Sequence, residues 1–311
     1  MKARAYADRV ALKVKCGVGL GVRTVISDGR QFAEIVDLLE TLRFDSLWLS
    51  ERATTGSFDP LAALAFAAGR TERLKLGTST LVVPGRNPVL LARELASLDV
   101  LSGGRFLPAF GLGTADDREH QAFGVRRNER ARWFDEAVPL MRRLWREESV
   151  THPGPRFPVT DLTITPKPVG RMEVWIGGRS PREYDRAGRL AQGWLGSFQT
   201  PDEAGHAREL IEAACATHGR TIDDDHYGMV LLYGRTGIAE AVQAFAARAR
   251  PDLPVNALVP TGADELTAMV DQFVAHGVSK FVLVPAGRPE SWSEELGWLA
   301  PVVRAIELQP R

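Results

Sequence analysis

Residues 44–52 read FDSLWLSER, and residues 59–114 read DPLAALAFAAGRTERLKLGTSTLVVPGRNPVLLARELASLDVLSGGRFLPAFGLGT. Short apolar runs in this stretch alternate with longer runs whose apolar residues recur at helical spacing. Asp59-Pro60 and Asn87-Pro88 each fit an N-cap followed by a first-turn proline, so a helix is predicted after each pair. This alternation predicts βαβ units around a parallel sheet that the helices cover.

The same alternation continues outward in both directions. Strands are expected at 16–20, 46–50, 74–79, 105–110, 173–176, 193–196, 228–233 and 280–284, with a short extended piece at 255–259. Helices are expected at 30–42, 61–68, 88–101, from 129 to about 145, from 180, and at 201–218, 237–249, 262–275 and 292–306. The five prolines of residues 149–169 favour a hairpin excursion there.

Eight strands with intervening helices fit a single (β/α)8 barrel domain over residues 1–311 better than an open sheet. The hairpin would then be an insertion between strands four and five. Gly17, Gly19 and Gly21 alternate near the start, but their spacing lacks the third glycine of a dinucleotide-binding fingerprint. An open dinucleotide-binding sheet is therefore the minor alternative.

Composition narrows the classes of partner. The 39 Lys and Arg residues cancel the 39 Asp and Glu residues, so net charge favours neither a nucleic-acid nor a membrane partner. The two cysteines and six histidines show no metal-ligand spacing, and residues 1–15 lack the apolar core of a signal peptide. We therefore expect a cytoplasmic enzyme or binding protein that acts on a small molecule without a metal.

A second block of motifs continues the first. It consists of Pro166-Lys167-Pro168, WIGGRS at 175–180, Ala187-Gly188-Arg189 and GWLG at 193–196. Together with the first block, over nearly the whole chain, it resembles the luciferase-like flavin- or deazaflavin-dependent oxidoreductases. The resemblance implies a TIM barrel of the bacterial-luciferase type, with the cofactor at the carboxyl ends of the strands. Trp48 and Trp194 are interpreted first as core residues of strands two and six.

The resemblance also implies where the cofactor lies. Ser79-Thr80 corresponds to a bulge of the family, often with a non-prolyl cis peptide, that supports one face of the tricyclic ring. Gly177-Gly178-Arg179-Ser180 offers N–H groups, a guanidinium and a hydroxyl that together suit a phosphate, although a glycine turn capped by Ser180 is the plain alternative. The full set of expected cofactor contacts is Glu51, Ser79, Thr80, Gly113, Thr114, Ala115, Gly177, Gly178, Arg179 and Ser180.

Two residues are the candidate catalytic groups. Arg52 stands where many relatives carry histidine, and a guanidinium cannot serve as the proton shuttle that an imidazole can. It could instead stabilise an anionic reduced cofactor or hold an acidic substrate. Asp116 stands where some deazaflavin enzymes keep a carboxylate, but a solvated loop aspartate is an equal alternative.

The first functional hypothesis is hydride transfer between coenzyme F420 and an unidentified organic substrate. An FMN-dependent monooxygenase that uses dioxygen is the second, and a non-catalytic flavin-binding protein is the third, because the histidine at position 52 is missing. Relatives often pair as homodimers through helices two and three of the barrel. The alanine-rich face of Ala62, Ala63, Ala65, Phe66 and Ala68 would permit such pairing and fits burial within the chain equally well.

Overall fold

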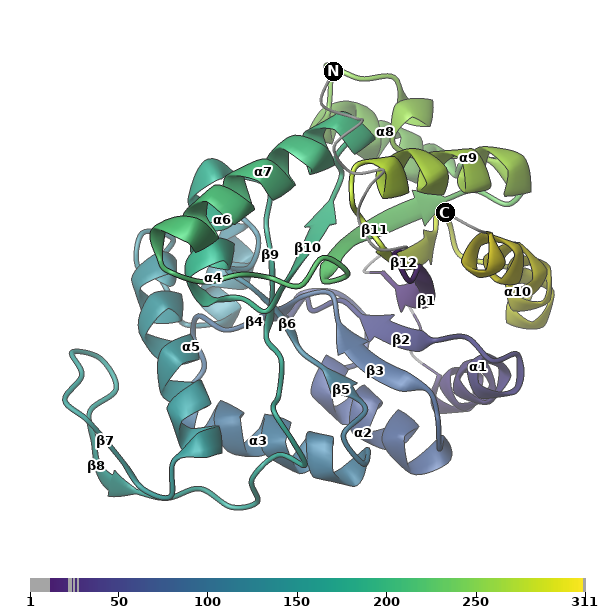
Figure 1. Ribbon diagram of the computed structural model, residues 1–311. Helices are drawn as coiled ribbons and strands as arrows, with labels where there is room; N and C mark the ends of the chain where they lie inside the picture. Colours follow the sequence, from purple (N-terminus) through teal and green to yellow (C-terminus); the bar gives the residue numbers. More distant parts are fainter. Residues whose placement is uncertain (1–11, 22–23, 25, 27, 310–311) are drawn as a thin grey trace.

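The computed structural model describes residues 12–21, 24, 26 and 28–309. The chain forms an α/β fold in which helices surround a curled parallel sheet (Figure 1). The order in the sheet is β4-β6-β9-β10-β11-β12-β1-β2-β3-β5. Its strands are β1 (Lys15–Leu20), β2 (Ser46–Leu49), β3 (Lys75–Thr78), β4 (Leu81–Val82), β5 (Phe106–Leu107), β6 (Ala109–Gly111), β9 (Trp175–Gly177), β10 (Gly193–Ser197), β11 (Tyr227–Tyr233) and β12 (Lys280–Pro285).

The two helices for which a cap followed by a proline was predicted begin there. The Asp59 side chain accepts from the N–H groups of Leu61 and Ala62, and the Asn87 side chain accepts from those of Val89 and Leu90. The helices are α1 (Gly29–Thr41), α2 (Pro60–Arg70), α3 (Pro88–Leu101), α4 (Asp117–Ala122), α5 (Arg130–Arg146), α6 (Pro181–Leu190), α7 (Pro201–Thr217), α8 (Glu240–Ala249), α9 (Gly262–Ala275) and α10 (Trp292–Leu308).

The strand predicted at 105–110 is broken into two pieces, and a short second strand follows the one predicted at 74–79, beyond its expected end. β3 and β4 are separated at Ser79-Thr80, whose peptide bond is cis, and β5 and β6 are separated at Pro108. β3 pairs with β5, and β4 pairs with β6, both in parallel. The pair β4-β6 stands at one end of the sheet order, and the pair β3-β5 stands at the other. Because β4 follows β3 and β6 follows β5 along the chain, the two ends of the sheet lie next to each other, and the sheet curls back on itself.

Tryptophans packed on glycines fill the inside of the curled sheet. A Cβ at Gly77 would lie 2.3 Å from the Trp48 ring, and one at Gly193 would lie 2.3 Å from the Trp175 ring. These two rings form a cluster with Ala109, Leu195, Val282 and Val284. Trp194, fully buried, belongs instead to the large cluster between sheet and helices. Both tryptophans that were interpreted as core residues are thus buried.

One short helix and one turn differ from the sequence prediction. α4 forms in the polar stretch after Gly113, where no helix was expected. Asp116 caps it, and its six residues are too few to show a helical pattern in the sequence. The expected extended piece at 255–259 is wrong, since Val255–Ala257 form a 3-10 turn after Pro254. In residues 149–169, β7 (Val150–His152) and β8 (Val159–Leu162) pair as an antiparallel ribbon, whose tip contacts α5 through hydrogen bonds from the Arg156 and Phe157 N–H groups to Glu136.

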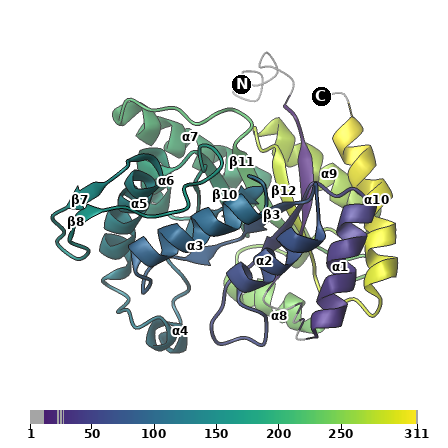
Figure 2. The ribbon, with the colours of Figure 1, turned by 90° about the horizontal axis from the view of Figure 1, so that it is seen from below.

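Several loops reach beyond the same edge of the sheet. Figure 2 shows α4, the loop after β2 and α8 together at the edge opposite to the start of β1. This edge holds the carboxyl ends of the parallel strands. Within the described residues, no helix is long and apolar enough to cross a membrane. The expectation about a signal peptide rests mainly on residues 1–11, which lie outside the described ranges.

Candidate active site

A cavity of about 580 Å³ opens at the carboxyl ends of the strands. Residues from β10, β11 and β12 supply an apolar side, including Leu195, Leu232 and Val284. The opposite side carries polar groups from the ends of β2, β3, β6 and β9. Of the predicted site residues, those that line the cavity are Glu51, Arg52, Ser79, Thr80, Gly113, Thr114, Gly177 and Gly178.

Thr80 is held between two glycines at the floor of this cavity. A Cβ at Gly111 would lie 2.4 Å from Thr80 Oγ1, and a Cβ at Gly177 would lie 2.8 Å from Thr80 Cγ2. The preceding residue is fixed as well, since the Ser50 hydroxyl donates to the Ser79 carbonyl at 3.0 Å. Only glycine leaves room for Thr80 at this point. The neighbouring strands therefore fix the Ser79-Thr80 segment where the resemblance places one face of the ring.

The Glu51 carboxylate faces inward and is engaged by the protein itself. It accepts from the Val82 N–H at 2.6 Å and from the Arg86 guanidinium. Burial raises the pKa of Glu51, and the Arg86 charge and the Val82 hydrogen bond offset part of that rise. Glu51 thus ties β4 to the end of β2, and its first role in this structure is to position the cavity wall.

Arg52 lies between two carboxylates of α4 and its cap. Its Nη2 is 3.5 Å from Asp116 Oδ2, and its Nε is 3.5 Å from Glu119 Oε1. The structure thus brings the two candidate catalytic residues together, although Asp116 lies outside the cavity lining. The Asp116 side chain also caps α4 by accepting from the Arg118 N–H. Asp116 therefore both ends the loop and balances the charge of Arg52.

Glu119 is a site residue that sequence reasoning missed. Its buried carboxylate accepts from the N–H groups of Ala53 and Thr54, at 3.1 and 2.9 Å, and from the Thr54 hydroxyl. Burial alone would raise the pKa of Glu119, but these hydrogen bonds and Arg52 outweigh it and hold the pKa below its ordinary value. Glu119 thus anchors the loop that carries Arg52.

Arg130 fixes the loop after β6. Its Nη1 donates to the carbonyls of Leu112, Gly113 and Thr114, at 3.2, 2.8 and 2.7 Å. Gly113 has a φ of 79°, in the region that favours glycine. Gly113 and Thr114 line the cavity, whereas Ala115 lies outside its lining. Sequence reasoning missed Arg130 as well, because it sits sixteen or more residues beyond the carbonyls that it binds.

The loop at 177–180 divides between two hollows. Gly177 and Gly178 line the main cavity, but the Arg179 side chain lines a neighbouring hollow of about 480 Å³ with Tyr184, Gln199 and Arg250. The backbone N–H groups of Arg179 and Ser180 and the Ser180 hydroxyl all donate to the Glu183 carboxylate. The donors expected to hold a phosphate are thus taken by a side chain of the protein. The ring site fits the cofactor, whereas this end fits a phosphate only if Glu183 moves.

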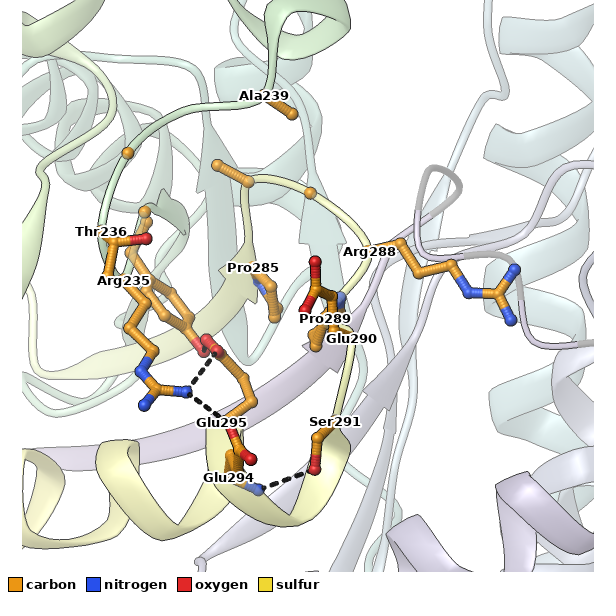
Figure 3. Close-up of a pocket in the computed structure, with 15 residues that line it drawn as sticks. Arg235, Thr236, Ala239, Pro285, Arg288, Pro289, Glu290, Ser291, Glu294 and Glu295 are labelled. Carbon is orange, nitrogen blue, oxygen red and sulfur yellow. Dashed lines mark hydrogen bonds and ion pairs between the residues drawn. The ribbon is translucent and has the colours of Figure 1, made fainter.

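A third hollow of about 360 Å³ lies next to the main cavity, with which it shares Pro285 (Figure 3). It lies between the loops after β11 and β12. The Tyr233 hydroxyl donates to the buried Glu295 carboxylate at 2.8 Å, and Arg235 reaches Glu294 at 3.8 Å. Burial and then the charge of Glu295 raise the pKa of Tyr233 well above its ordinary value. Tyr233 and Arg235 at this hollow are therefore paired with Glu295 and Glu294.

Comparison with known proteins agrees with this geometry. The sequence pattern described as luciferase-like monooxygenase matches residues 13–272, so the chain belongs to the luciferase-like monooxygenase family. Proteins named F420-dependent glucose-6-phosphate dehydrogenase are similar to it. The one from Microbacterium testaceum (strain StLB037) is 30% identical over 200 residues, and the one from Intrasporangium calvum is 32% identical over 207 residues. Each alignment covers 60% of this chain and 59% of the relative, so the chain spans about three fifths of these relatives' length.

Solved structures show the same fold at lower identity. An F420-dependent secondary alcohol dehydrogenase in complex with an F420-acetone adduct superposes with a TM-score of 0.81 at 18% identity, over 95% of this chain and 99% of that one. The oxygenating constituent of 3,6-diketocamphane monooxygenase from Pseudomonas putida, in complex with FMN, gives 0.74 at 16% identity, over 97% and 98%. The fold is thus shared by proteins whose names specify F420 and by proteins whose names specify FMN.

Proposed function

We propose that this protein is an oxidoreductase that transfers a hydride between coenzyme F420 and an organic substrate. The observation that carries the proposal is the 580 Å³ cavity at the carboxyl ends of the strands, whose floor is Ser79-Thr80 held between Gly111 and Gly177. The names of the aligned relatives, F420-dependent glucose-6-phosphate dehydrogenases, support F420 as the cofactor. The identity of the organic substrate is left open.

Different residues of the cavity would bind the ring and stabilise its charge. Bound F420 would supply the hydride chemistry, and the protein would supply binding, orientation and electrostatics. Ser79, Thr80, Gly113 and Thr114 would support the ring from the strand ends. Arg52, held by Glu119 and Asp116, would donate hydrogen bonds from its guanidinium to an anionic reduced cofactor or an acidic substrate.

An FMN-dependent monooxygenase is the second candidate, favoured by the shared fold of an FMN-bound oxygenase. A screen of alcohols, sugar phosphates and ketones distinguishes the two. Hydride transfer changes the visible absorbance of F420 in step with the substrate and consumes no dioxygen. Oxygenation consumes dioxygen in the presence of reduced FMN. Substrate-dependent dioxygen uptake with FMN, and no absorbance change with F420, would contradict the proposal.

The proposal also includes the domain architecture and the oligomeric state. We read residues 1–311 as one cytoplasmic (β/α)8 barrel domain in which the β7–β8 ribbon is the insertion between strands four and five. A homodimer through α2 and α3 is supported by large apolar side chains that these helices leave exposed, namely Phe66, Leu90 and Leu101. Ala63 and Ala68, by contrast, are buried within the chain. Sedimentation of the wild type and of Phe66→Asp, which should dissociate a dimer, tests the pairing.

A further inference from the structure

The Glu183 carboxylate occupies the anion-binding end of the candidate cofactor site. Its Oε2 accepts from the Arg179 N–H at 3.0 Å, from the Ser180 N–H at 3.0 Å and from the Ser180 hydroxyl at 2.8 Å. Gly178 makes this possible, because a Cβ there would lie 2.5 Å from the Cβ of Glu183. The first turn of α6 therefore carries its own anion.

Glu183 also belongs to the main cavity. It lines the cavity together with Gly177 and Gly178, so its carboxylate faces the space that a cofactor side chain would enter. Arg130 is close enough for its pKa to respond to Glu183, although burial is the largest cause of the lowered pKa of Arg130. Two N–H groups and one hydroxyl at this end thus already bind one negative charge.

A phosphate that enters this end of the cavity would lie close to the negative charge of the Glu183 carboxylate. A phosphate monoester carries close to two negative charges at neutral pH, whereas a phosphodiester carries one. Like charges within a few ångströms repel strongly in a partly buried site, and the repulsion grows with the charge of the ligand. The end of FMN is a monoester, and the phosphate of F420 is a diester. The two cofactors therefore differ at the place where Glu183 lies.

We propose that Glu183 is a specificity-determining residue of the cofactor site, which selects against a phosphate monoester by occupying the donors of Arg179 and Ser180. This inference rests on the proposed function, because it concerns the same cavity. In the wild type, the phosphate of FMN contributes little or nothing to affinity, so FMN binds no better than riboflavin. F420, whose phosphate group carries a single charge, loses less at this position than FMN does.

The test compares the binding of ligands that differ in their phosphate group to the wild type and to Glu183→Gln. Glutamine at this third helical position can still accept from the Ser180 N–H, so the cap of α6 is kept. Dissociation constants for FMN, riboflavin and F420 are measured by fluorescence quenching and calorimetry, and a thermal melt checks folding. Glu265→Gln is the matched control, since Glu265 accepts from the Thr261 N–H at the start of α9 and lies outside the cavity lining.

We expect the affinity for FMN relative to riboflavin to rise about tenfold or more in Glu183→Gln, by removal of one like charge beside the phosphate. The preference for F420 over FMN should fall accordingly, and Glu265→Gln should match the wild type. If the wild type binds F420 but the FMN-to-riboflavin ratio is the same in Glu183→Gln, this inference fails and the proposed function stands. If the wild type binds none of the three ligands, both fail.

Discussion

Gly111→Ala tests the arrangement at the floor of the cavity. The new methyl group would lie 2.4 Å from Thr80 Oγ1 and 3.3 Å from Thr80 Cβ. Thr80 Oγ1 must therefore move by about 1 Å, either by rotation of the Thr80 side chain or by a shift of the Ser79-Thr80 backbone away from β6.

The size of the effect follows from this overpacking. Inserting one methyl group into a well-packed site costs about 1–3 kcal/mol, which for a chain of 311 residues lowers the melting temperature by about 2–5 °C. Because a cofactor site tolerates displacements of only about 0.5 Å, we expect the affinity for F420 to fall about tenfold or more.

Thermal unfolding and F420 titration of the same samples measure both effects. Gly69→Ala is the control, since Gly69 lies in α2 with open space at its Cβ position. Alanine there should stabilise the helix by up to about 1 kcal/mol and leave the affinity for F420 unchanged. A Gly111→Ala protein that melts and binds F420 as the wild type does would refute the placement of Thr80 as the support of the ring.

Three further predictions follow from the structure. Gly77→Ala puts a methyl group 2.3 Å from the Trp48 ring, so calorimetry should show a lower melting temperature, whereas an unchanged one would argue against this packing. Glu119→Gln should lower the free energy of unfolding at pH 7, measured by urea denaturation. Because the pKa of Glu119 is lowered in the folded state, its stabilisation is present above the ordinary pKa of a glutamate and is lost as pH falls through the lowered pKa. The difference in free energy of unfolding between the wild type and Glu119→Gln should therefore shrink in acid. A difference that is constant with pH would contradict the role of the Glu119 charge. Arg52→Gln should weaken binding of reduced, anionic F420 more than binding of oxidised F420, and equal weakening would remove Arg52 from that role.

Much of the fold could be predicted because its signals are local. Asp59 and Asn87 precede prolines, and a helix start needs only the cap and the few N–H groups that follow it. The break between β3 and β4 and the break at Pro108 are different, because they depend on how two strands meet when the sheet curls. The short turn at Val255–Ala257 lay below the length at which periodicity can separate a strand from a helix.

The site residues at the ends of strands could be predicted from the sequence, whereas the charged residues that contact them over long sequence distances could not. Gly113, Thr114, Gly177 and Gly178 follow strands whose carboxyl ends must meet, so they were expected together. Glu119 was missed because its partners lie more than sixty residues earlier, and nothing local announces such contacts. The position of Glu183 had a local signal, since Ser180 and Glu183 have the spacing of a capping box.

Binding of the cofactor tests the central claim most directly. The apo-protein is titrated with F420 and, separately, with FMN, each oxidised and reduced, and binding is followed by fluorescence and calorimetry. We predict micromolar or tighter binding of F420 and weaker binding of FMN. Selective binding of FMN would move the protein to the oxygenase branch of its family. If neither cofactor binds in either redox state, the assignment of the cavity around Ser79-Thr80 as a cofactor site is wrong.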